Sequence, residues 1–99
     1  MNMQAMLRQA QNLQKEMMKT KEEIDKMEFE GTSSFVTVRV NGTKEVLSVK
    51  INKDSDFDID DLEILEEMIQ IATNEALTKV DKETEKKMGK YSSMMPGLF

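Results

Sequence analysis

The sequence contains no cysteine and no histidine, and these two absences exclude several classes of function. Disulfides, thiolate or imidazole metal sites and nearly all nucleophilic triads require one of the two residues. Hydrophobic runs are also short, and none approaches the ~20 residues of a membrane-spanning helix. Because the N-terminal segment is polar and has a helical pattern, we expect no signal peptide. The composition predicts a soluble protein and fits a reducing cytoplasm.

Glycine and proline are scarce, with 4 and 1 residues, and no glycine-rich phosphate-binding motif is present. Carboxylates are plentiful, but they lie on a polar stretch with no apolar cleft to tune them for acid–base catalysis. We therefore expect a protein that is not an enzyme and has no cofactor, no small-molecule substrate and no membrane association.

The chain of 99 residues is expected to form one domain. A domain of this size buries only part of its chain and is often marginally stable alone. Oligomerisation is a common remedy.

The net charge of −5 is unevenly distributed. Residues 54–67 contain eight acidic residues and no basic residue, so the other 85 residues carry a net charge of +3. Residues 1–21 contain four bases and one acid, and residues 79–90 contain five bases and three acids. A polyanion could therefore be bound by the two basic segments while the acidic segment faces away.

Residues 3–27 have the pattern of one long helix with a continuous apolar seam. Apolar residues recur at alternating spacings of three and four, the repeat of helices that pack along one another, and Thr20 is the one polar member. A second copy of the molecule is the simplest partner for a seam on a projecting helix. The expected dimer seam consists of Met3, Met6, Ala10, Leu13, Met17 and Ile24.

Residues 35–51 have the pattern of a β-hairpin. Two alternating runs flank Asn41-Gly42, the strongest short signal for a two-residue hairpin turn. Such a turn pairs Val40 with Thr43. The apolar face of the hairpin would then consist of Val36, Val38, Val40, Leu47, Val49 and Ile51.

The same register places Arg39 opposite Lys44, a like-charge pair that costs some stability. Residues 27–33 are expected to add a third strand at the edge of the sheet, with Gly31 as a bulge or bend.

Residues 61–88 are expected to form a second long helix with a broad apolar stripe. Asp60 can cap its N-terminus, with Glu63 as the return partner. Gly89 is the expected stop, and residues 91–99 are expected to form a loose tail. The predicted fold is α+β with the order α-β-β-β-α, a three-stranded antiparallel sheet with two long projecting helices.

Several segments resemble the YbaB/EbfC family of bacterial nucleoid-associated DNA-binding proteins. They span nearly the whole chain in the family's order: LRQAQNLQKEM (7–17), VTVRVNGTKEVLSVKI (36–51), LEILEEMIQIATNEALTKV (62–80) and PGLF (96–99). The family usually has a glycine-rich run before the second strand, where this chain has GTSSF (31–35).

The resemblance implies a cytoplasmic, nucleoid-associated homodimer whose paired helices protrude like the arms of tweezers. It also implies binding to duplex DNA, often with weak sequence preference, and a role in nucleoid organisation or gene regulation. Basic side chains can neutralise phosphates, and amides can contact phosphates or base edges. The candidate residues on the first helix are Gln4, Arg8, Gln11, Asn12, Lys15 and Lys19. Those near the end of the second helix are Lys79, Lys82, Lys86, Lys87 and Lys90.

Two other interpretations compete with DNA binding. The basic helix faces can be ordinary solvated surfaces, or the seam and the acidic stretch can engage a protein partner.

The acidic stretch also matches four ligand positions of a calcium-binding loop, with Asp56, Asp58, Asp60 and Glu67. Asp61 replaces the glycine of the sharp turn, and the residues after it have a helical pattern that cannot wrap an ion. We therefore expect helix capping here and no metal.

Overall fold

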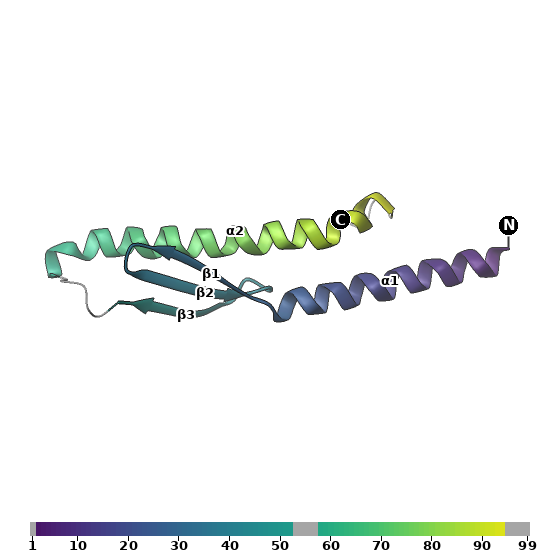
Figure 1. Ribbon diagram of the computed structural model, residues 1–99, viewed down its shortest axis with the longest axis horizontal. Coiled ribbons are helices and arrows are strands. Elements are labelled where there is room, and N and C mark those ends of the chain that lie inside the picture. Colours follow the sequence, from purple (N-terminus) through teal and green to yellow (C-terminus); the bar gives the residue numbers. More distant parts are fainter. Residues whose placement is uncertain (1, 53–57, 95–99) are drawn as a thin grey trace.

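The structure is a computed structural model that describes residues 2–52 and 58–94, with the backbone alone for residues 92–94. The three strands form one antiparallel sheet in the order β1-β2-β3, so the predicted α-β-β-β-α fold is confirmed. The elements are α1 (Met3–Lys26), β1 (Glu28–Ser33), β2 (Val36–Asn41), β3 (Val46–Ile51), the short 3₁₀ helix η1 (Ile59–Asp61) and α2 (Leu62–Met94) (Figure 1).

The molecule is strongly elongated. Its extents are 71 × 19 × 14 Å and its radius of gyration is 19.7 Å, against about 13 Å for a compact domain of this size. α2 lies along one face of the sheet, and α1 leaves the sheet where β1 begins and projects past the end of α2 (Figure 1). The first half of α1 is therefore an arm that the other residues described by the structure leave largely exposed.

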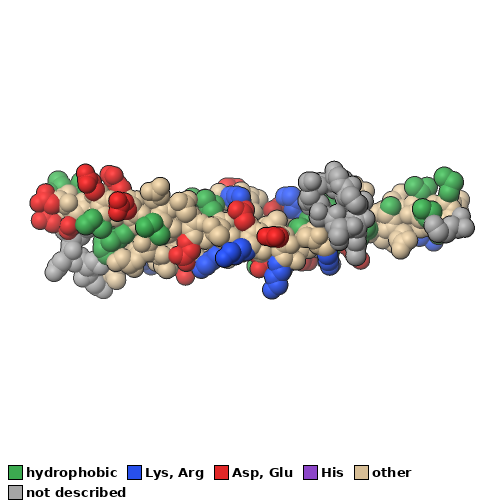
Figure 2. All heavy atoms as spheres, turned by 90° about the horizontal axis from the view of Figure 1, so that it is seen from above, with side chains coloured by type: hydrophobic (Ala, Val, Ile, Leu, Met, Phe, Trp, Pro, Cys, Tyr) green, Lys and Arg blue, Asp and Glu red, His purple; other side chains and the backbone are tan. Residues whose placement is uncertain are grey.

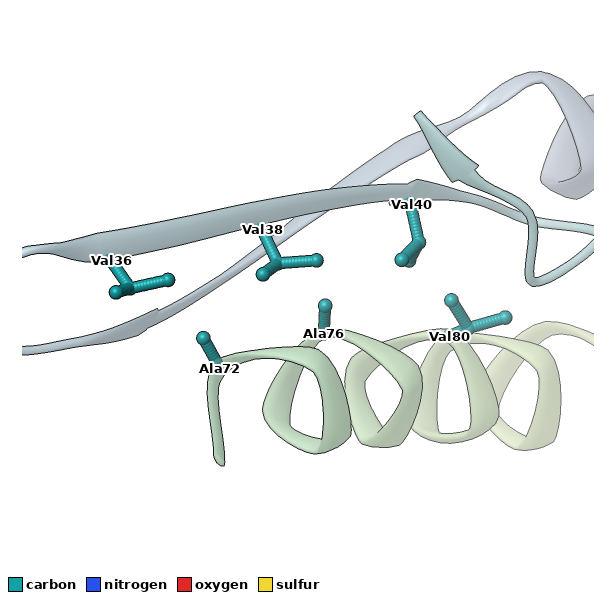
Figure 3. Packing of buried hydrophobic residues seen from close by; sticks show 6 residues of the cluster. All are labelled: Val36, Val38, Val40, Ala72, Ala76 and Val80. Atoms are coloured by element: carbon teal, nitrogen blue, oxygen red, sulfur yellow. The ribbon is translucent and has the colours of Figure 1, made fainter. Parts of the chain in front are cut away.

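The core joins β2 to α2. Alternate residues of β2 point toward the helix, and small residues one helical turn apart point back at them (Figure 3). The six side chains are at most 1% exposed: Val36, Val38, Val40, Ala72, Ala76 and Val80.

Gly31 lets α2 approach β1 closely. A Cβ at this position would overlap the carbonyl oxygen of Ala72 and would lie 2.6 Å from the backbone nitrogen of Ala76. The pairing of β1 with β2 is continuous from Glu28 to Ser33, so the expectation of a bulge or bend at Gly31 was wrong. The glycine is therefore required by a tertiary contact with the backbone of α2, and not by a local irregularity of the strand.

The turn between β2 and β3 encloses three residues, Gly42, Thr43 and Lys44, between the hydrogen-bonded Asn41 and Glu45, instead of the two expected. Its backbone closes through a hydrogen bond from Asn41 N–H to Glu45 O at 3.0 Å, and Lys44 takes the left-handed conformation with φ 69°. The Asn41 side-chain oxygen accepts hydrogen bonds from the backbone N–H groups of Thr43 and Glu45 at 3.0 and 2.9 Å. Asn41 therefore organises the turn from its first position, and Val40 pairs with Val46 and not with Thr43.

The new register separates the two basic residues that were expected to face each other. Arg39 pairs with Ser48 and forms an ion pair with Glu28 at 3.5 Å. Lys44 reaches α2 and forms an ion pair with Asp81 at 2.6 Å.

β3 is an edge strand whose apolar side chains remain exposed. α2 packs on β1 and β2, and β3 lies beside them. The expected apolar face is therefore buried on β2 but not on β3. The exposed apolar residues of β3 are Val46, Leu47, Val49 and Ile51.

Two expectations for the second helix were wrong. The N-cap is Asp58 and not Asp60. It caps η1, which leads into α2, and Asp61 is the return partner of this capping box. α2 also continues through Gly89 to Met94, because Tyr91 is 2% exposed and packs on α1, which outweighs the cost of a helical glycine of about 1 kcal/mol. The expected tail is thus helical as far as residue 94, and residues 95–99 lie outside the described residues.

Candidate nucleic-acid interface

The second half of the α1 seam packs within the chain. Ile24 is 2% exposed and contacts Met88 and Tyr91 of α2, with Leu13 and Met17 beside them. This part of the seam therefore belongs to the internal contact between the two helices, and Ile24 is not available to a second copy.

The first half of the seam is uncovered. Met3 is 77% exposed and Met6 is 50% exposed, and Ala10 is exposed as well. These residues lie on the part of α1 that projects past the end of α2 (Figure 1). Their expected role in a dimer seam stays a prediction.

The candidate residues of α1 lie on the side of the helix opposite the packed seam. At about 100° per residue, the centre of this set is turned by about 180° from the line of Leu13, Met17 and Ile24. All six side chains are exposed: Gln4, Arg8, Gln11, Asn12, Lys15 and Lys19. The fold thus brings the predicted residues together on one stripe, which we call the α1 polar stripe.

The bases of the α1 polar stripe are available to an anion. In the described part of the chain, no hydrogen bond or ion pair involves the side chains of Arg8, Lys15 or Lys19. Lys21, by contrast, lies on a flank of the packed seam and pairs with Asp25 at 3.5 Å. Lys26 was missed by the sequence analysis, although it is exposed and its helical angle coincides with that of Arg8.

The lysines near the end of α2 differ in whether they already have a partner. Lys79 donates to the Glu30 carbonyl oxygen at 2.7 Å and lies 3.5 Å from Glu75, and Lys87 lies 3.2 Å from Glu83 and 3.7 Å from the Met27 sulfur.

Lys90 lies 5.0 Å from the centre of the Tyr91 ring. Lys82 and Lys86 are exposed and, among the residues that the structure describes, have no ion pair. Of the five candidate lysines of α2, only Lys82 and Lys86 therefore resemble the α1 bases in being available to bind an anion.

Acidic and basic residues are separated along the molecule. Residues 58–67 contain six acids and lie where η1 and α2 begin, and α1 projects from the other end (Figure 1). Figure 2 shows acidic side chains gathered at that first end, and lysine and arginine side chains over the middle of the molecule. A polyanion at α1 is thus remote from the main concentration of negative charge.

The described ranges, residues 2–52 and 58–94, contain no group of three or more carboxylates placed to hold a metal ion. Asp56 of the possible calcium loop lies outside them, and Asp58 and Asp61 serve as caps. Within the same ranges, no helix has the length and apolar character needed to cross a bilayer.

Known proteins resemble this chain over its whole length. A nucleoid-associated protein of Streptococcus suis (strain 05ZYH33) is 46% identical over 98 residues, which cover 97% of this chain and 98% of that protein. A nucleoid-associated protein of Ligilactobacillus salivarius (strain UCC118) is 40% identical over 100 residues, covering 99% and 95% of the two chains. The model of the YbaB/EbfC DNA-binding family, which is not an enzyme family, matches residues 1–95. The chain therefore belongs to the YbaB/EbfC DNA-binding family.

Proposed function

We propose that this protein binds duplex DNA as a homodimer, mainly through phosphate contacts made by α1, and acts in nucleoid organisation or gene regulation. The proposal places it on the nucleoid in the bacterial cytoplasm, as the names of its relatives suggest. The observation that carries it is the α1 polar stripe, with three bases that have no partner in the described chain. The N-terminal part of α1 projects past the end of α2, so DNA can approach this part of the stripe (Figure 1).

Phosphate contacts suit this surface better than base readout. Arginine and lysine neutralise phosphates, and the interleaved amides can donate to phosphate oxygens. The stripe follows one side of a straight helix. Such a surface fixes the protein on the backbone with little sequence information.

The dimer is proposed to form mainly through β3. An edge strand presents unpaired backbone groups, and this one also carries four exposed apolar side chains. A second copy can pair with the strand and cover those side chains by the same self-complementary contact. The uncovered part of the α1 seam, from Met3 to Ala10, is the second surface proposed to join the copies.

The test exchanges two bases of the α1 polar stripe, Arg8→Gln with Lys15→Gln. Each phosphate contact contributes roughly tenfold to affinity at about 0.1 M salt, so DNA retention in a gel shift should fall at least tenfold. The matched control is Lys21→Gln with Arg39→Gln, which changes the net charge equally at two bases that are already ion-paired. Equal loss in both variants would show a nonspecific charge effect.

A protein partner is the alternative that one observation favours. Ile59 is 74% exposed and Ile64 is 50% exposed beside the acids at the start of α2, a combination suited to a cationic, amphipathic partner. Unchanged DNA retention in the Arg8→Gln, Lys15→Gln variant, with the solution mass intact, would favour this alternative.

A further inference from the structure

The turn between β2 and β3 touches α1 where the helix leaves the body of the molecule (Figure 1). A Cβ on Gly42 would overlap the carbonyl oxygen of Ile24 and would lie 2.8 Å from the Cα of Asp25. Both atoms belong to the helix backbone, so they cannot rotate away as the end of a side chain could. Gly42 and the last turn of α1 are therefore in direct backbone contact.

The other side of the turn is fastened to α2. Lys44 Nζ lies 2.6 Å from Asp81 Oδ1, and the Asn41 side chain holds the turn in shape through its bonds to Thr43 and Glu45. The exposed ion pair adds little stability. The turn therefore contacts both helices, with Gly42 on α1 and Lys44 on α2.

A second contact holds α1 about one helical turn farther toward its N-terminus. Thr20 Oγ1 lies 3.3 Å from the Tyr91 hydroxyl, above the packing of Tyr91 and Met88 on Ile24. Gly42 against Ile24 and Tyr91 against Thr20 are thus two points that hold the helix, and the partly buried side chains of Leu13 and Met17 pack on the same cluster beyond them. These points are about 6 Å apart along the helix axis at about 1.5 Å per residue.

We propose that Gly42 is a positioning residue for DNA binding, because it sets the angle at which α1 projects and hence which phosphates Gln4 and Arg8 reach. This inference rests on the proposed function. With Thr20 as the pivot, a displacement of about 1 Å at the Gly42 contact would move Met3, about 25 Å beyond Thr20, by up to about 4 Å. Successive phosphates of one strand are spaced at about 3.4 Å along the axis of the DNA helix. A methyl group at this position therefore shifts the arm by up to about one phosphate.

The test is Gly42→Ala in the full chain, with the arm angle measured by pulsed electron spin resonance. The chain has no cysteine of its own, so spin labels attach only at cysteines that are introduced. We choose Gln9→Cys on α1 and Asn74→Cys on α2, because both positions are exposed. Labelled protein is mixed with an excess of unlabelled protein, so that one copy of a dimer carries labels. Gln9 lies about 16 Å beyond Thr20, so we expect the distance to change by up to about 3 Å and DNA retention to fall about tenfold for each lost phosphate contact.

Gly89→Ala is the matched control, because a Cβ there meets nothing within 4 Å. It should leave both the label distance and DNA retention unchanged. A folded Gly42→Ala protein with an unchanged distance, or with a changed distance and full DNA retention, would overturn the proposal.

A second variant keeps the proposal open to refutation if Gly42→Ala fails to fold. Tyr91→Phe removes only the hydroxyl that meets Thr20, and should broaden the distance distribution and weaken DNA retention. An unchanged distribution would contradict the two-point account. If the parent protein itself retains no DNA, the proposed function fails, and the label distances still decide whether Gly42 sets the angle.

Discussion

At the scale of single residues, Ser34 carries backbone strain. It occupies the first position of the two-residue turn between β1 and β2 with φ 52°, where glycine is usual. A left-handed conformation costs an L-residue about 1–2 kcal/mol, and the greater unfolded-state freedom of glycine offsets about 0.5–1 kcal/mol of that. Ser34→Gly should therefore raise the free energy of unfolding by about 0.5–1 kcal/mol in a urea titration.

Ser33→Gly is the control for this prediction, because Ser33 lies in β1 without a positive φ. It should lower stability by about 0.5–1 kcal/mol. A loss of stability in both variants would show that the positive φ of Ser34 is not strained.

Gly31 should tolerate no side chain. Gly31→Ala places a methyl group against the backbone of α2 at Ala72 and Ala76, and neither neighbour can yield by rotating a side chain. We expect a loss of about 1–3 kcal/mol in the free energy of unfolding, the usual cost of overpacking. An unchanged urea midpoint would mean that α2 does not lie as close to β1 as described.

At the scale of elements, α2 should gain stability when its one internal glycine is replaced. Gly89 is exposed, a Cβ there would meet nothing within 4 Å, and the residues that pack on α1 are its helix neighbours Met88 and Tyr91. Gly89→Ala should stabilise the protein by up to about 1 kcal/mol, measured by urea unfolding. A loss of stability would indicate that the helix does end at Gly89.

β3 is predicted to hold the dimer together. Val49→Lys puts a charge among its exposed apolar side chains and should halve the mass measured by light scattering. Ser48→Glu adds a charge to the same strand at a neighbouring position that is already polar, where the carboxylate faces Arg39, and should leave the mass unchanged. A Val49→Lys protein that keeps the dimer mass would move the interface elsewhere.

The local patterns of the sequence predicted the elements but not their contacts. The spacing of Leu13, Met17 and Ile24 predicted α1, yet the partner of this stretch is Tyr91, which follows a glycine that signals a helix stop. Asn41-Gly42 predicted the hairpin, but Gly42 is needed for a tertiary contact with α1 and not for a two-residue turn. Such constraints arise between distant segments, so no local periodicity contains them.

The candidate interface could be predicted better on α1 than on α2. Helical spacing alone placed Arg8, Lys15 and Lys19 on one face, and the fold leaves that face exposed. Lys79 and Lys87 have acidic neighbours at i−4, and the fold adds contacts to β1 and to the residue preceding it. Those additional contacts depend on how α2 lies across the sheet.

At the scale of the whole molecule, a net-negative protein is proposed to bind a polyanion because its charges lie apart. The acids concentrate at one end of a body 71 Å long, and lysine and arginine side chains lie over its middle and on α1, away from that end. The two arms of a dimer would together present about 4–8 phosphate contacts. Such binding releases counterions from the DNA, and its strength must therefore depend on salt.

The most direct test of this account is a gel-shift titration of duplex DNA over a range of salt concentrations, on protein whose solution mass is measured in parallel. We predict that the logarithm of the binding constant falls with the logarithm of salt concentration with a slope of about −4 to −7. A flat response would contradict the central claim that the arms hold DNA by its phosphates.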